Sequence, residues 1–179
     1  MKILIIGSVA AGTSAAAKAR RNDESSEIKI YEKDSHISYS ACGTPYYIGG
    51  SVESIESLTP RNAAFFKSKH NVDVFIRHEV LSVNPTEKII SVKNLDDGNT
   101  FTKNYDKLII ATGAKSIIPP IDGIDKNNVF SLRNITSAVI IKNYINANNV
   151  KSALIVGSGF IGMELAENFS STGIETTIV

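Results

Sequence analysis

The chain has 179 residues, of which 42% are hydrophobic and 21% are charged. These values are ordinary for a folded chain of one domain or slightly more, so they exclude a disordered protein, a collagen-like repeat and a small disulfide-stapled domain. Nineteen Lys and Arg balance eighteen Asp and Glu, for a formal charge of +1. Because neither nucleic acid nor an anionic membrane would be attracted by this charge, we expect a small-molecule partner.

Cys42 is the only cysteine, which excludes an intramolecular disulfide and suits the reducing cytoplasm. The apolar start of the chain resembles a signal peptide, but the apolar run is short and Gly7, Gly12 and basic residues interrupt it. No apolar stretch approaches the length of a membrane span. We therefore expect a cytoplasmic protein.

The first part of the chain predicts a βαβ unit. Residues 3–6 form a short apolar run that is typical of a strand buried on both faces of a parallel sheet. Gly7 ends this strand, and the Ala-rich residues 12–21 predict a helix with basic residues in its last turn. A polar loop at 22–26 then leads to a second strand at 28–31.

The middle of the chain changes character. After a predicted helix at 60–69, short alternating segments at 73–76, 80–83, 89–93 and around Phe101 predict an antiparallel meander. Residues 108–111 return to the pattern of a buried strand, residues 119–123 form a stiff turn, and residues 136–146 predict a helix.

The opening pattern repeats after a linker at 148–149. A further buried strand is predicted at 153–156, followed by a glycine loop at 157–162, a helix at 163–171 that Gly173 ends, and a strand from 176. The fold class is therefore α/β: an incomplete Rossmann-like domain with an antiparallel meander at 1–148, followed by the start of a second Rossmann-like domain at 149–179. Because the second parallel unit needs further strands to cover it, we expect an N-terminal piece of a longer protein.

Two glycine loops predict dinucleotide binding. In a G-x-G-x-x-G loop between a strand and a helix, the glycines allow the tight turn, the approach of a pyrophosphate and close helix packing. The second loop is complete, whereas the first has Val9 at the second glycine position. The candidate contacts are Gly7, Val9, Ala10, Ala11, Gly12, Gly157, Gly159, Phe160, Ile161, Gly162 and Glu164.

Glu32 ends the second predicted strand, twenty residues after Gly12. An acid at this place accepts hydrogen bonds from the ribose of a bound dinucleotide. The alternative is a solvated carboxylate at a strand end. We include Lys33, its neighbour, among the candidate cofactor contacts.

The order of these motifs resembles the FAD-dependent pyridine nucleotide-disulfide oxidoreductases, in which an FAD loop, a redox-active cysteine, an ATG motif and an NAD(P) loop follow one another. The ATG motif is present as Ala111, Thr112 and Gly113, and the resemblance spans the whole chain. It implies FAD and NAD(P)H as cofactors and a homodimer at full length. It also implies that the Val80 backbone meets the adenine and that Arg133 lies beside the flavin.

The residue five beyond Cys42 is Tyr47, where two-cysteine members of the family carry their second cysteine. The chain thus resembles the single-cysteine branch, and residues 38–47 are most similar to its coenzyme A-disulfide and persulfide reductases. The alternative is that Cys42 is a small buried hydrophobe. Gly43 and Pro45 argue against it, because they place Cys42 beside a helix N-terminus, where the helix dipole favours a thiolate.

The resemblance further implies a substrate site for a CoA-type disulfide or persulfide. Arg21 and Ser38 match positions that hold the CoA nucleotide, with Lys18 and Lys69 as helpers, and Ser14 and Ala41 complete the candidate set. For Arg21 the alternative is a charge that stabilises a helix C-terminus.

The expected activity passes electrons from NAD(P)H through FAD to Cys42, which reduces the CoA disulfide or persulfide. One alternative is an NADH oxidase or peroxidase with a cysteine sulfenic acid. Another is a catalytically silent dinucleotide-binding piece. Peroxidases and many oxidases of this branch carry a histidine where this chain has Ala10, and His36, His70 and His78 are expected at the surface. We predict no metal site and identify no general acid.

Overall fold

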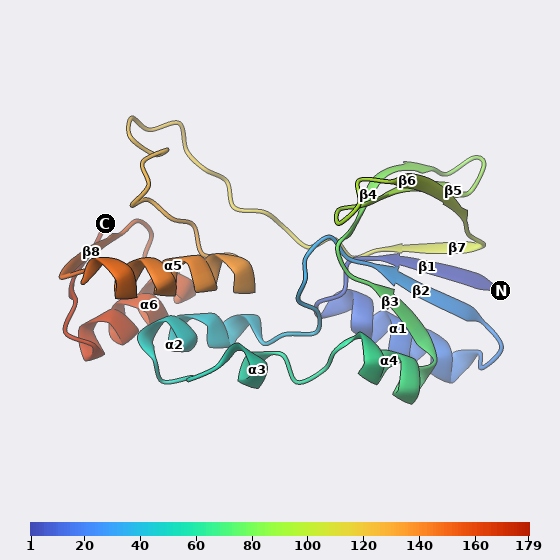
Figure 1. The fold of residues 1–179 in the computed structure, drawn as a ribbon, viewed down its shortest axis with the longest axis horizontal. Helices are drawn as coiled ribbons and strands as arrows, with labels where there is room; N and C mark the ends of the chain where they lie inside the picture. Colours follow the sequence, from blue (N-terminus) through green and yellow to red (C-terminus); the bar gives the residue numbers. More distant parts are fainter. The chain divides into compact units, whose positions relative to one another are not determined.

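The computed structural model describes residues 1–179, which form two compact units (Figure 1). Unit 1 comprises Met1–Tyr39 and Thr59–Ala114, and unit 2 comprises Ser40–Leu58 and Lys115–Val179. Each unit has its own buried hydrophobic residues. The predicted domain boundary at 148/149 lies inside unit 2 and stays a prediction about the intact protein.

Unit 1 is built on a four-stranded parallel sheet. Its strands are β1 (Lys2–Ile6), β2 (Glu27–Tyr31), β3 (Val72–Phe75) and β7 (Lys107–Ile110), in the order β3-β2-β1-β7. Helices α1 (Ala11–Asn22) and α4 (Ala63–His70) cover one face of this sheet (Figure 1). Ile5, Ile28 and Ile30 are buried in the core on that face, so the β-branched runs form the central strands that they predict.

The other face of the sheet carries a three-stranded antiparallel meander. It consists of β4 (His78–Asn84), β5 (Ile89–Asn94) and β6 (Thr100–Asn104), in the order β4-β5-β6. Leu4 and Tyr31 of the parallel sheet pack against Ile90 and Val92 of the meander. The predicted α/β class, with a parallel sheet and an antiparallel meander, is confirmed.

Two strand predictions in unit 1 are corrected. Residues 73–76 were expected in the meander, but β3 pairs in parallel with β2, Ile28 opposite Val72. Since β3 is an edge strand, its residues beyond Val72 are only half-buried. The start of its sequence therefore alternates between apolar and polar residues, as in a strand of an antiparallel sheet. β7 is the opposite edge strand, and Ile110 is therefore exposed rather than buried.

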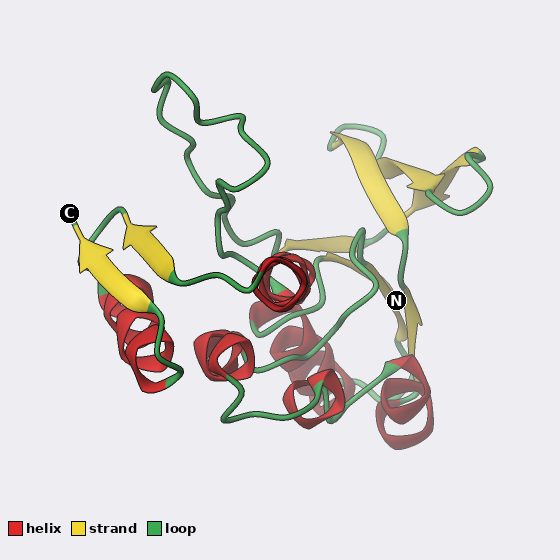
Figure 2. Cartoon of the chain, turned by 60° about the vertical axis from the view of Figure 1, so that its left-hand side comes forward, coloured by secondary structure: helices red, strands yellow, loops and turns green.

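Unit 2 combines helices with a two-stranded parallel sheet. Its elements are the short 3₁₀ helix η1 (Ala41–Gly43), α2 (Thr44–Gly49), α3 (Ile55–Leu58), α5 (Ile135–Asn148), β8 (Ser152–Ile155), α6 (Phe160–Ser171) and β9 (Glu175–Ile178). The core contains Ile48 of α2, Ala138 and Ile141 of α5, and Leu165 and Phe169 of α6. Residues 115–134 form neither helix nor strand, as the loop colouring of Figure 2 shows.

The residues at the ends of α5 and α6 explain where these helices begin and end. Asn134 starts α5 with a capping box, in which its side chain accepts the Ser137 N–H at 2.9 Å and Ser137 Oγ accepts the Asn134 N–H at 3.0 Å. Gly173, with φ of 80°, ends α6 as predicted. The prediction of a fully buried strand at 153–156 is wrong for Leu154 and Val156, which are exposed because the unit 2 core covers only the face of Ala153 and Ile155.

Candidate functional site

The first glycine loop lies at the carboxyl end of β1. Gly7 has φ of 99°, and its N–H bonds to the Tyr31 carbonyl at 2.9 Å. A Cβ on Gly7 would overlap the carbonyl of Ala111, and a Cβ on Gly12 would overlap that of Gly7. Only glycine therefore lets β1, α1 and the chain after β7 approach so closely.

The N-terminus of α1 is open to an anion. Ala10 occupies the N-cap position and offers no side-chain hydrogen bond, so the first N–H groups of the helix have no side-chain cap. Ala10 and Ala11 are exposed and Val9 is half-buried. These residues fit the pyrophosphate of a dinucleotide.

Glu32 is buried beside this loop, with 8% of its surface exposed, which excludes the solvated strand-end alternative. Its Oε2 accepts the N–H and the hydroxyl of Ser8 at 2.8 and 2.9 Å, and its Oε1 accepts the Asp34 N–H at 2.9 Å. A carboxylate has about four acceptor positions, so one remains for a ribose hydroxyl. Lys33, next in the chain, is exposed.

The ATG motif and Val80 also lie in unit 1. The Ala111 N–H bonds to the Ile6 carbonyl at 2.8 Å, which holds the motif next to the glycine loop, and Thr112 and Gly113 are exposed. Val80 is half-buried in β4 opposite Val92. Unit 1 thus brings the loop, Glu32 and the ATG motif to the carboxyl edge of its parallel sheet, where ligands of α/β folds bind.

Cys42 is exposed in unit 2, in η1 directly before α2. The Gly43 N–H bonds to the Ser40 carbonyl at 3.1 Å, and the Thr44 hydroxyl bonds to the Ala41 carbonyl at 2.8 Å. A Cβ on Gly43 would overlap the Leu58 side chain, so this glycine allows the turn to pack on α3. The exposure excludes the alternative of a small buried hydrophobe.

The second glycine loop connects β8 to α6 in unit 2. A Cβ on Gly162 would overlap the carbonyl of Gly157, whereas a Cβ on Gly157 or Gly159 would meet no atom within 4 Å. The open space at Gly159, and the absence of a side-chain cap there, fit the approach of a pyrophosphate. Phe160 and Ile161 are exposed, and Glu164 is half-buried.

Arg133 is exposed in unit 2, one residue before the cap of α5, and its backbone N–H bonds to Ser137 Oγ at 2.9 Å. The candidate cofactor residues are thus divided between the two units. Arg133 and the second loop belong to unit 2, whereas the first loop and Glu32 belong to unit 1.

Some of the substrate candidates lie together on α1, and the others lie elsewhere. Ser14, Lys18 and Arg21 are exposed and spaced by four and three residues, which places them on one face of α1. Ser38 is half-buried with φ of 49°, and its N–H bonds to the Ser8 carbonyl at 2.9 Å. Lys69 is exposed in α4, and Ala41 is exposed beside Cys42 in unit 2.

Ser8 and Arg20 were missed by the sequence reasoning. Ser8 holds Glu32, and its signal was a small polar residue directly after the first glycine. Arg20 donates to the His70 and Asn71 carbonyls at 2.9 Å each and so ties α1 to the end of α4. No sequence pattern separates it from its neighbour Arg21.

The three histidines, expected at the surface, are only partly exposed. All three are half-buried. The ring of His78 packs near Phe75 and Phe101, with ring centroids 5.7 and 6.0 Å away, and His70 lies between aromatic rings of α4. No group of three or more His, Cys, Asp or Glu is placed to hold a metal ion. None of the helices combines the length and the apolar character needed to cross a bilayer.

Comparison with known proteins gives matches along the whole chain. The family model described as pyridine nucleotide-disulphide oxidoreductase matches residues 1–179. The chain is 36% identical to a coenzyme A disulfide reductase of Staphylococcus haemolyticus, covering 99% of this chain and 40% of that protein. It is 37% identical to an NADH oxidase of Methanocaldococcus jannaschii, covering 100% of this chain and 40% of that protein.

The solved structures include a NAD-dependent persulfide reductase from A. fulgidus. The TM-score is 0.94 at 34% sequence identity, covering 99% of this chain and 33% of that chain. The chain thus spans 40% of the length of the two curated relatives that it matches.

Proposed function

Because the chain belongs to the pyridine nucleotide-disulphide oxidoreductase family, we propose that the intact protein is an NAD(P)H-dependent flavoprotein that reduces a CoA disulfide or a related persulfide at Cys42. Enzymes of this family use FAD and a pyridine nucleotide, so the predicted cofactors FAD and NAD(P)H are confirmed at the level of the family. In the proposal, residues 1–148 belong to the FAD domain and residues 149–179 begin the NAD(P)H domain.

The observation that carries the proposal is the exposed thiol of Cys42 in the turn before α2. Only an exposed sulfur can meet a disulfide with two bulky substituents. The Cys42 thiolate attacks one sulfur of the CoA disulfide, the sulfur–sulfur bond breaks, and one CoA leaves as a thiolate. Sγ of Cys42 keeps the other CoA as a mixed disulfide. Bound FAD would supply the two electrons, taken from NAD(P)H, that reduce this bond.

The chain's own residues position these partners. Gly7, Gly12 and the open end of α1 would receive the pyrophosphate of FAD, and Glu32 would accept a ribose hydroxyl. Gly157 and Gly159 would do the same for NAD(P)H. The exposed α1 face with Ser14, Lys18 and Arg21 would bind the CoA nucleotide through charge-assisted hydrogen bonds to phosphate.

The second candidate is an NADH oxidase or peroxidase, which the 37% identity to an NADH oxidase supports. In that reaction Cys42 would cycle through a sulfenic acid. Reduction of peroxide benefits from an acid that protonates the departing hydroxide, and Ala10 supplies none. A CoA thiolate is a much weaker base than hydroxide, so it leaves with less help. A catalytically silent dinucleotide-binding protein is the third candidate.

The test compares electron acceptors on the intact, FAD-loaded protein. We expect kcat/KM to be highest for CoA disulfide or CoA persulfide, and Cys42→Ser to abolish that turnover while NAD(P)H still reduces the flavin. A serine variant that keeps disulfide turnover would make Cys42 structural. A colourless protein that cannot be reconstituted with FAD would refute the flavoprotein assignment.

A second variant tests the substrate class. Arg21→Ala should raise KM for the CoA substrate by about tenfold or more, since a charge-assisted hydrogen bond contributes about 1.5 to 3 kcal/mol. Lys93→Ala, which removes an exposed cation of the meander, is the matched control and should change nothing. Faster turnover with oxygen or peroxide, together with a silent Arg21→Ala, would favour the oxidase or peroxidase. The homodimer and the cytoplasmic location stay predictions, and sedimentation and fractionation test them.

A further inference from the structure

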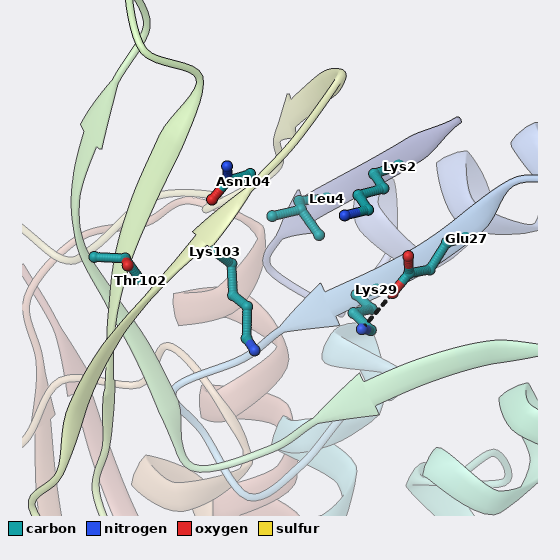
Figure 3. A pocket seen from close by; sticks show the side chains of 7 residues that line it. All are labelled: Lys2, Leu4, Glu27, Lys29, Thr102, Lys103 and Asn104. Atoms are coloured by element: carbon teal, nitrogen blue, oxygen red, sulfur yellow. Dashed lines mark ion pairs between the residues drawn. The ribbon is translucent and has the colours of Figure 1, made fainter.

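Unit 1 contains a hollow that neither glycine loop uses, which we name the amino-edge hollow. It has a volume of about 360 Å³ and is lined by Lys2 and Leu4 of β1, Glu27 and Lys29 of β2, and residues 102–104 of β6 (Figure 3). This volume lies within the usual range of small-molecule pockets, about 300 to 1,000 Å³. The hollow is therefore large enough for a small ligand.

The charges around the amino-edge hollow are unbalanced. Lys2, Lys29 and Lys103 contribute three ammonium groups, whereas Glu27 is the only carboxylate in the lining. Glu27 already pairs with Lys29 at 2.5 Å, and the side chains of Lys2 and Lys103 are in none of the ion pairs of the structure. The ammonium of Lys103 lies over the Phe101 ring, 5.3 Å from the ring centroid. Three positive charges against one negative charge leave a surplus of two.

The neighbouring carboxylates reduce this surplus without removing it. Asp73, on the next strand, pairs with Lys67 at 2.7 Å. Asp106 accepts the backbone N–H of Lys2 at 2.6 Å, and because that N–H is neutral, the charge of Asp106 lowers the surplus to about one. A hollow lined mainly by one sign of charge concentrates oppositely charged ligands, so the charges favour an anion as the partner.

The directions of the donors indicate the shape of that anion. Figure 3 shows Lys103 extending from β6 toward β2, where Lys29 pairs with Glu27, while Lys2 comes from β1. Thr102 and Asn104 add a hydroxyl and an amide to the lining. Donors from several directions suit the tetrahedral oxygens of phosphate better than a planar carboxylate. We propose that the amino-edge hollow binds a phosphate group, as free phosphate or as a phosphomonoester of a small molecule.

This site is separate from the proposed cofactor site. Lys2 opens β1, and Gly7 follows its last residue, Ile6. A strand rises by about 3.3 Å per residue, so the hollow and the first glycine loop lie at opposite ends of the sheet, roughly 16 Å apart. Phosphate binding here therefore does not rest on the proposed function.

The experiment titrates the intact protein by calorimetry with inorganic phosphate and with glycerol 3-phosphate. The protein is loaded with FAD and saturated with NAD⁺ so that both glycine loops are filled. It carries Arg21→Ala so that the proposed CoA phosphate site on α1 is removed, and chloride keeps the ionic strength constant. We expect one saturable phosphate site per chain. Tighter binding of glycerol 3-phosphate than of inorganic phosphate would identify a monoester as the source.

Matched lysine variants locate the site. Lys103→Gln should weaken phosphate binding by up to about fivefold, the upper range for an exposed ion pair, and Lys2→Gln is the second variant if the first unfolds. Lys93→Gln removes an exposed lysine of the same meander outside the hollow and should leave the affinity within twofold. Absence of saturable binding at millimolar phosphate, or an equal loss in Lys93→Gln and the hollow variants, would overturn the proposal.

Discussion

Tyr31→Phe should make the protein more stable, although it removes a polar group from a buried tyrosine. The side chain is 1% exposed, its ring stacks on Phe75 with centroids 5.2 Å apart, and its hydroxyl has no hydrogen-bond partner. A buried polar group without a partner costs about 1 to 3 kcal/mol, and phenylalanine keeps the ring in place. We expect the free energy of unfolding to rise by about 1 kcal/mol.

The pH dependence gives an independent check on the same hydroxyl. Burial, with smaller contributions from Glu27 and Asp73, raises the pKa of Tyr31 to about 12. An unfolded tyrosine ionises near pH 10. The contribution of the neutral Tyr31 hydroxyl to the free energy of unfolding of the wild type is therefore complete below about pH 10 and is lost as the pH rises toward about 12. At about pH 11 this ionisation stabilises the unfolded wild-type chain by roughly 1.4 kcal/mol relative to the folded chain. The phenylalanine variant cannot ionise here, so its free energy of unfolding does not fall by this amount.

The assay is urea unfolding of the intact protein in phosphate-free buffer at pH 8 and pH 11, followed by circular dichroism. The advantage of Tyr31→Phe should widen from the lower to the higher pH. Tyr46→Phe, which alters a tyrosine with 38% exposure in α2, is the matched control and should differ from wild type at neither pH. A loss of about 1 kcal/mol in Tyr31→Phe at pH 8 would show that the hydroxyl has a partner and refute the reasoning.

Four further substitutions test the site and the fold. Glu32→Gln should weaken FAD binding about tenfold, because an amide replaces the carboxylate that accepts three hydrogen bonds, and fluorescence of released FAD measures it. Gly12→Ala should lower the free energy of unfolding by about 1 to 3 kcal/mol, since the new methyl overlaps a carbonyl oxygen. Gly159→Ala, with open space around it, should cost less than about 0.5 kcal/mol but weaken NADH binding; equal losses of stability in both glycine variants would contradict this. Asn134→Ala should cost about 1 kcal/mol through loss of the α5 cap, as thermal unfolding would show, and an unchanged midpoint would count against the capping box.

The family, the α/β class and the central elements were predictable because local sequence determines them. Short β-branched runs at the start of the chain and at 28–31 form the two central strands. Both faces of these strands are buried, so an uninterrupted apolar run indicates such a strand directly. The edge strands were misjudged for the same physical reason. β3 has a neighbouring strand on one side only, and β8 is buried on one face only. Their sequence patterns therefore do not show how the strands pair.

The candidate site was predictable as a set of motifs and not as a set of contacts. The glycines and the acid after β2 follow from spacing, but the Ser8 partner of Glu32 depends on how two loops meet. The same holds for Arg20 and Arg21. They are adjacent and identical in chemistry, yet one is bound to carbonyls of the α4 end and the other is exposed.

The hydrogen bonds from Ser8 and Asp34 to Glu32 also affect the thermodynamics of cofactor binding. These hydrogen bonds are made within the protein itself and hold the glycine loop to the residues after β2, and Ser8 and Glu32 are both buried. A dinucleotide that enters such a preorganised cradle does not have to immobilise a loop, which saves about 0.5 to 1.5 kcal/mol for each side chain already fixed. FAD uptake at this edge of the sheet should thus show a small entropic penalty from the protein, with most of the ordering cost met during folding.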